Sequence, residues 1–211
     1  MTIAALAITT SAGSAAMIYF EESGGQVVME AENFQNSTAS AANTWQVLNT
    51  GFSNFRGDGF IQANPDIANS NGGSPDDPTV EYNVKIDTTG TYDLFHRSLA
   101  GDGGPAANSG FSNSFWSNVV EVTPAAVRDD TGSGNDFATT SWLKAGSWTI
   151  STAGFYTVRI SMREDGAAID TLILQLDSLG NPTGNGPAES PIVIPEPASV
   201  ALFGLGGLLM L

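Results

Sequence analysis

Two glutamates separated by one residue, Glu30 and Glu32, lie in a run of residues typical of a β-strand. On such a strand their side chains leave the same face about 6–7 Å apart. Two carboxylates this close repel each other unless a cation or a basic group lies between them. Three interpretations stay open: a site for a hard cation such as calcium, which prefers oxygen ligands, neutralisation by Arg159 or Arg163, or two carboxylates that face solvent.

Carboxylates are too common in this chain for a pair of them to indicate catalysis. The sequence holds 22 Asp and Glu residues against 7 Lys and Arg. A glycosidase needs two carboxyl groups about 5–10 Å apart across a cleft, whereas neighbours such as Glu164 and Asp165 point apart on an extended chain. Cysteine is absent and His96 is the one histidine, which excludes thiol nucleophiles, zinc–thiolate centres and multi-histidine metal sites. We therefore expect no catalytic residues and a protein that is not an enzyme.

Tryptophans in polar surroundings are the second candidate for chemistry, because sugar rings stack their C–H groups on aromatic faces. Trp45 and Trp142 each follow a short polar stretch, so both are expected in loops and are predicted platforms for a carbohydrate. Arg97, Asn113 and Asp165 are predicted to hydrogen-bond the sugar hydroxyls. For Arg97 an ion pair with one of the many acids is the alternative.

The net charge excludes one large class of partner. At pH 7 the chain carries a formal charge of −15, and its isoelectric point is near 4.1. Such a surface repels phosphate backbones, so we expect no nucleic-acid partner. Two explanations of the negative charge stay open. The acidic residues bind a cation, or they simply keep the protein soluble.

The elements that must position these residues are short strands. The chain has 24 Gly and 10 Pro, and turn-forming residues separate short runs rich in aromatic and β-branched residues. No helical periodicity is sustained before the C-terminal tail, so we predict an all-β protein, a jelly-roll β-sandwich over residues 19–180 with a C-terminal hydrophobic helical tail. The expected strands are Gln26–Glu32, Thr79–Ile86, Thr91–Leu99, Asn118–Val122, Ser147–Thr149, Gly154–Met162 and Ala168–Leu176.

Three phrases of this body, taken in order, resemble the carbohydrate-binding module family 6-like domains, which are galactose-binding-like jelly rolls. They are VMEAENF at 28–34, GTYDLFHR at 90–97 and MREDGAAIDTL at 162–172, with NSFW at 113–116 between the last two. The resemblance implies that Glu30, Glu32 and Asp170 hold a structural calcium ion, and that the partner is a polysaccharide.

The two ends of the chain read differently from the body. Residues 1–18 are apolar and rich in small side chains, which indicates a signal-peptide remnant, and residues 181–194 are predicted to be a flexible linker. The motif Pro195-Glu196-Pro197 and the uncharged apolar run after it resemble the PEP-CTERM sorting signal of exported bacterial proteins. The resemblance implies that an exosortase-type membrane protease processes residues 195–211, which anchor the protein in the membrane beforehand.

Together these features predict an exported, non-catalytic carbohydrate-binding protein at the cell surface or in the extracellular matrix. The alternative is a structural surface or biofilm-matrix protein that keeps the jelly roll but has no sugar site.

Overall fold

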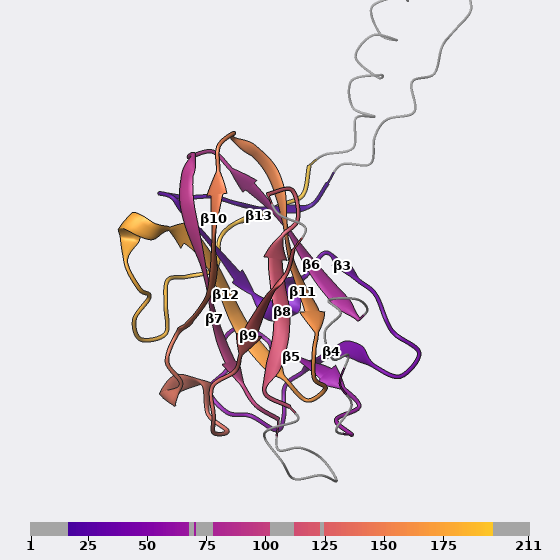
Figure 1. Cartoon of the computed structure of the whole chain (residues 1–211). Coiled ribbons are helices and arrows are strands. Elements are labelled where there is room, and N and C mark those ends of the chain that lie inside the picture. The colour runs from indigo at the N-terminus through magenta and orange to yellow at the C-terminus, as the bar shows by residue number, and fades with distance from the viewer. Residues whose placement is uncertain (1–16, 68–69, 71–77, 102–111, 123–124, 196–211) are drawn as a thin grey trace, which may run out of the picture.

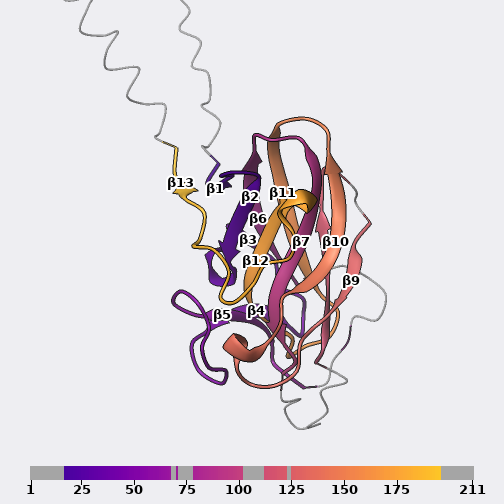
Figure 2. The same ribbon diagram turned by 90° about the vertical axis from the view of Figure 1, so that its left-hand side faces the viewer.

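The computed structural model describes residues 17–67, 70, 78–101, 112–122 and 125–195. Two β-sheets pack face to face with the core between them (Figures 1 and 2). The predicted all-β sandwich is confirmed. The predicted helical tail, Glu196 and Pro197 lie outside the described residues, as does nearly all of the predicted signal peptide.

The first sheet has the order β13-β1-β6-β11-β8-β9, and β3 also pairs with β6. All its pairings are antiparallel except that of β1 with β6, which is parallel. Its strands are β1 (Tyr19–Glu21), β3 (Asn36–Ser37), β6 (Thr79–Ile86), β8 (Ser114–Val119), β9 (Val127–Asp130), β11 (Gly154–Met162) and β13 (Ile192–Val193).

The second sheet has the order β10-β7-β12-β5-β4, and β2 also pairs with β12. All its pairings are antiparallel. Its strands are β2 (Gln26–Glu30), β4 (Thr44–Leu48), β5 (Phe60–Asn64), β7 (Gly90–Leu99), β10 (Leu143–Ile150) and β12 (Ala168–Leu176). The 3₁₀ helices η1 (Ala31–Asn33), η4 (Phe137–Thr139) and η5 (Asp177–Leu179) follow β2, β9 and β12.

Side-chain alternation explains the first sheet but not the whole of the second. Along β6 the buried side chains of Val80, Tyr82, Val84 and Ile86 alternate with half-buried ones, as a sheet with one solvated face requires. Eight of the nine residues of β12 are instead buried, so both faces of this strand are covered.

A C-terminal strap covers the outer face of β12. We use this name for residues 180–191, which run back along the second sheet between η5 and β13 (Figure 2). Ser190 donates its backbone N–H to the Val28 carbonyl (2.9 Å), and its side-chain Oγ accepts the Val28 N–H (3.0 Å). The prediction of a free linker over residues 181–194 is therefore wrong, because these residues bond to the sandwich and then pair as β13 with β1.

This pairing brings both described ends of the chain together. Tyr19 lies opposite Val193, and the two ends leave the same end of the sandwich (Figures 1 and 2). The loop between β4 and β5 and the segment with η4 lie toward the opposite end (Figure 1). Within the described part of the chain, no helix is long and apolar enough to span a bilayer.

The predicted strands correspond to β2, β6, β7, β8, β10, β11 and β12, with three clear differences in extent. The strand predicted at Ser147–Thr149 is longer and spans Leu143–Ile150. The strand predicted at Asn118–Val122 lies instead at Ser114–Val119. The strand predicted at Gln26–Glu32 ends at Glu30, where the chain turns into η1. Strands β1, β3, β4, β5, β9 and β13 were not predicted, and most of them are short.

Candidate functional site

Glu30 and Glu32 converge, but not as members of one strand. Glu30 ends β2 and Glu32 lies in η1. Their carboxylates meet at Gly57, where an added Cβ would lie 2.2 Å from Glu30 Oε2 and 2.2 Å from Glu32 Oε1. Gly57 has a φ of 59°, a left-handed conformation that also favours glycine. The bare backbone at this position therefore lets the two carboxylates approach each other.

The electrostatics of this pair favour a positive charge nearby. Burial is the main cause that raises the pKa of Glu32 to about 7, and the charge of Glu30 adds a smaller increase. The bonds that Glu32 Oε1 accepts from the N–H groups of Asp58 and Gly59 lower this pKa, but by less. Burial and then the charge of Glu189 raise the pKa of Glu30. The Glu32 Oε2 atom is buried and accepts no hydrogen bond from the described residues.

The basic group closest to this pair is one that the sequence did not indicate. Arg56 Nη2 lies 3.6 Å from Glu30 Oε1. Arg159 and Arg163, the predicted neutralising residues, pair with Glu81 and Glu164 instead. The prediction that Arg159 or Arg163 neutralises the pair is therefore wrong. Arg159 lies in β11 of the first sheet and Arg163 directly follows that strand, whereas the pair lies beside the second sheet.

Asp170 lies beside the pair but is already bonded. It is fully buried on β12, and its Oδ2 accepts bonds from Arg97 Nε (2.7 Å) and Thr171 Oγ1 (2.8 Å). Its Oδ1 accepts the backbone N–H of Arg56 at 2.6 Å. The ion-pair alternative for Arg97 is thus the arrangement found, with Arg97 Nη2 2.6 Å from Asp170 Oδ2.

These observations decide which oxygens fit a cation. Glu32 Oε2, which accepts no bond from the described residues, and the adjacent Glu30 carboxylate are oxygens of the kind that a hard cation such as calcium prefers. Asp170 fits less well, since both its oxygens accept bonds. Among the described residues, no group of three or more His, Cys, Asp and Glu side chains is arranged to hold a metal.

The two predicted platform tryptophans do not form one surface. Trp45 lies in β4 rather than in a loop, is 4% exposed, and donates its Nε1–H to the Pro78 carbonyl (3.1 Å). Its ring is part of the core, so the prediction of an exposed platform at Trp45 is wrong. The polar residues before Trp45 belong to the β3–β4 connection, which faces solvent, whereas Trp45 itself does not.

Trp142 lies on the outer face of the second sheet, beneath the strap. It is half-buried against Val28, Phe95 and Ile173, and its Nε1–H bonds the Gly184 carbonyl at 3.0 Å. The Arg97 guanidinium carbon lies 5.7 Å from its ring centre. Trp142 and Arg97 thus lie together, but the strap occupies the surface that a sugar would need.

Asn113 and Asp165 lie at the loop end, where they hold the backbone. The Asn113 N–H donates to Glu164 Oε2 (3.1 Å), and the fully buried Asp165 accepts the Ile67 N–H at 2.8 Å. Neither Asn113 nor Asp165 is among the described residues that line the pocket found at this end of the sandwich.

That pocket has a volume of about 480 Å³ and lies between the β4–β5 loop, the end of β7 and the segment before η4. Phe52 lines it with part of its ring exposed, supported by Phe60 (ring centres 5.3 Å apart) and Phe137 (5.6 Å). Gln62, also in the lining, is oriented by the bond from its Nε2 to the Gly166 carbonyl (2.9 Å). We call this the loop-end pocket.

The loop-end pocket was not predicted, because only tryptophans were expected to form sugar platforms. Phe52 stands in Gly51-Phe52-Ser53-Asn54, an aromatic among turn-forming residues, which is the same signal that singled out Trp142. The bond from the Ser53 N–H to the Asn135 carbonyl (3.0 Å) joins this loop to one 82 residues further along the chain, a proximity that no local pattern predicts.

The model of the glycosyl hydrolase family 115 C-terminal domain matches residues 19–189. The chain belongs to this family. The match includes most of the strap, in agreement with its packing on the sandwich. No curated protein matches the chain.

Solved structures similar to this family 115 C-terminal domain include carbohydrate-binding modules. A GH26-CBM35 β-(1,4)-mannanase from Podospora anserina has a TM-score of 0.50 at 18% identity, over 82% of this chain and 29% of that one. The CBM35 of Cellvibrio japonicus Abf62 scores 0.44 at 17% identity, over 71% and 91% of the two chains. A family 35 module from Clostridium thermocellum scores 0.43 at 16% identity, over 71% and 96%. At these identities the similarity is one of fold.

Proposed function

We propose that this protein is a non-catalytic carbohydrate-binding protein whose site is the loop-end pocket. The observation that carries the proposal is the partly exposed ring of Phe52 beside the oriented amide of Gln62, in a hollow of about 480 Å³. An apolar face with a few fixed polar groups is what sugar recognition needs, and the volume lies in the usual range for ligand pockets. Membership of a glycosyl hydrolase-associated domain family and the CBM-like fold support it.

The proposal of binding without catalysis has its own support. None of the described residues that line the loop-end pocket is an aspartate or glutamate. The nearby Glu164 accepts bonds from Asn113 and Ser114 and pairs with Arg163, so it serves the fold.

The test replaces Phe52 in two ways. Phe52→Leu keeps apolar volume against Phe60 and Phe137 but removes the aromatic face, while Phe52→Ala removes both. We expect Phe52→Leu to weaken binding of the neutral oligosaccharides mannohexaose and laminarihexaose by about tenfold or more, the worth of about 1.4 kcal/mol of stacking, with little change in melting temperature. Isothermal titration calorimetry measures the affinity.

Absence of binding by the unaltered chain to either oligosaccharide would favour the alternative, a structural surface or matrix protein without a sugar site. Retention of full affinity by Phe52→Leu would place binding outside the loop-end pocket.

We further propose that Glu30 and Glu32 hold a structural calcium ion, with backbone oxygens completing its shell and Asp170 supporting it through Arg56. If calcium ties η1 to the β4–β5 loop, excess EDTA should lower the melting temperature of the full chain by roughly 10 °C, since each kcal/mol shifts it by about 2–4 °C at this size. Glu32→Gln should abolish the effect of EDTA, whereas Asp177→Asn, an exposed acid in η5, should leave it intact. Identical melting curves with calcium and with EDTA would rule the ion out.

Export completes the proposal. The apolar start, the Pro195-Glu196-Pro197 motif and the apolar run after it support secretion, transient anchoring in the membrane and processing by an exosortase-type protease, with the cell surface or extracellular matrix as destination. The intact mass of the protein recovered outside the cells tests this. A protein that still carries residues 198–211 would contradict processing.

A further inference from the structure

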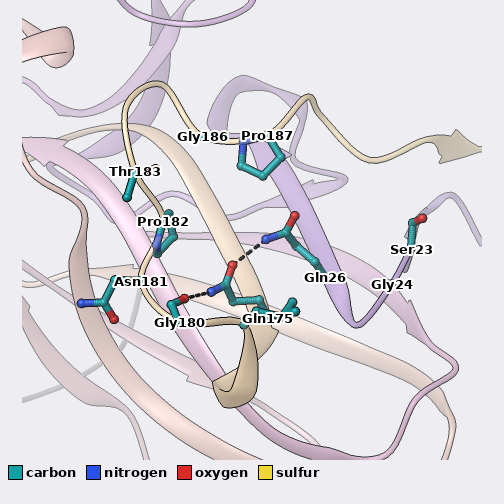
Figure 3. Close-up of a pocket in the computed structure, with 11 residues that line it drawn as sticks. Ser23, Gly24, Gln26, Gln175, Gly180, Asn181, Pro182, Thr183, Gly186 and Pro187 are labelled. Atoms are coloured by element: carbon teal, nitrogen blue, oxygen red, sulfur yellow. Dashed lines mark hydrogen bonds between the residues drawn. The ribbon is translucent and has the colours of Figure 1, made fainter.

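A second hollow, of about 470 Å³, lies between the strap and the start of β2 (Figure 3). It adjoins Gln175, near the end of β12, whereas the loop-end pocket adjoins the turn before β12 begins. The two hollows therefore lie toward opposite ends of the same strand, and we call this one the strap pocket.

One wall of the strap pocket is held in place from outside it. The Trp142 Nε1–H bonds the Gly184 carbonyl, and Arg56 Nη1 donates to the carbonyls of Asn185 (2.9 Å) and Pro187 (2.6 Å). An added Cβ at Gly186 would lie 2.7 Å from Trp142 Cζ2, so the strap sits directly on the indole ring. These contacts make the wall preformed, which spares a ligand the entropy of ordering it.

The floor of the strap pocket is a row of side-chain amides. Gln26 Nε2 donates to Gln175 Oε1 at 2.5 Å, and Gln175 Nε2 donates to the Gly180 carbonyl (Figure 3). Gln175 is 2% exposed, so the row has a fixed direction. These bonds leave the Gln26 carbonyl oxygen and its second N–H available to a ligand.

The rest of the lining is neutral. Ser23, Asn181 and Thr183 contribute further polar groups, and Pro182 and Pro187 contribute C–H surface (Figure 3). Leu179 also lines the pocket. None of the described lining residues carries a charge, so the pocket offers no counter-ion to an anionic ligand, in a protein whose surface is otherwise acidic.

We propose that the strap pocket is a second carbohydrate site, selective for neutral saccharides, in which the Gln26 amide and the strap hydroxyl and amide groups bind sugar hydroxyls. Fixed amides that both donate and accept match hydroxyl groups, which do the same. The inference rests on the proposed function. Two sites on one domain let a polysaccharide be held at two points, which raises the overall affinity without new contacts.

The experiment follows the backbone and side-chain amide signals of the full chain by NMR while mannohexaose, laminarihexaose and galacturonic acid oligomers are added. The two neutral sugars should shift the Gln26 and Asn181 amide signals, and the acidic oligomers should not. The double variant Asn181→Ala, Thr183→Val should weaken this second binding about tenfold. Ser178→Ala, an exposed residue beside the pocket that does not line it, is the matched control.

The outcomes separate this inference from the proposed function. Shifts confined to the loop-end pocket, or strap-pocket shifts that the double variant leaves unchanged, would overturn the second site and leave the first standing. Shifts at Gln26 that persist in Phe52→Leu would support two independent sites. No shift with any sugar would overturn both.

Discussion

At the scale of single residues, Asp129 is the side chain whose environment is least compatible with its charge. It lies on β9 opposite Phe115, is 3% exposed, and neither carboxylate oxygen reaches a hydrogen-bond partner among the described residues. Burial raises its pKa to about 7, against the lowering effect of the neighbouring Ser117 hydroxyl.

The sign of the resulting pH dependence follows from this raised pKa. The folded state holds the proton more tightly than the unfolded state, so stability from this group is present below about pH 4 and is lost as the pH rises toward 7. Asp129→Asn should therefore stabilise the protein at pH 8 by up to about 4 kcal/mol and by much less at pH 4. Urea unfolding at both values measures it. Asp130→Asn, the exposed neighbour paired with Arg128, is the control, and an equal effect of Asp129→Asn at both pH values would contradict the prediction.

The stability of Asp129→Asn must be compared with that of the unaltered protein at each pH, because His96 changes the stability with pH in the opposite sense. Burial lowers its pKa to about 3, so its contribution is lost as the pH falls through the same range. The difference between variant and unaltered protein cancels this term.

At the scale of elements, the strap replaces the solvent that would otherwise face Val28, Phe95 and Ile173. Trp142 bonds the Gly184 carbonyl and packs beneath Gly186. Trp142→Phe removes the bond to Gly184 and part of the ring beneath Gly186, and should cost about 1–2 kcal/mol. Trp142→Ala removes the remaining packing as well and should cost about 2–4 kcal/mol. Hydrogen exchange should quicken over residues 180–190 in the alanine variant. Unchanged exchange there would mean that the strap is held independently of Trp142.

At the scale of the whole molecule, the domain is completed by its last described strand. A chain that ends at residue 195 keeps the strap and the β13–β1 pairing and should melt like the full chain. One that ends at residue 180 loses the bonds of Ser190 and Arg56 and exposes an apolar face, so it should melt about 10 °C lower or more. Equal melting temperatures would show that the strap adds nothing to stability.

The sequence by itself determined the class of the fold and most of the long strands, because alternating apolar residues and frequent turns specify a half-buried strand locally. It also singled out Glu30, Glu32, Arg97 and Asp170, which do lie in one region. It could not predict the turn into η1, which depends on Gly57 and the β4–β5 loop meeting the glutamates from far along the chain.

Tertiary structure alone decided which polar or aromatic residues are accessible. Trp45 and Phe52 both stand near turn-forming residues, yet one is in the core and the other lines a pocket. The Gly- and Pro-rich composition of residues 181–194 is typical of a linker, but the apolar outer face of β12 binds it. The composition of a segment indicates how flexible its backbone is. Whether the segment stays in solvent or packs on the domain depends on the apolar surface beside it, which only the tertiary structure forms.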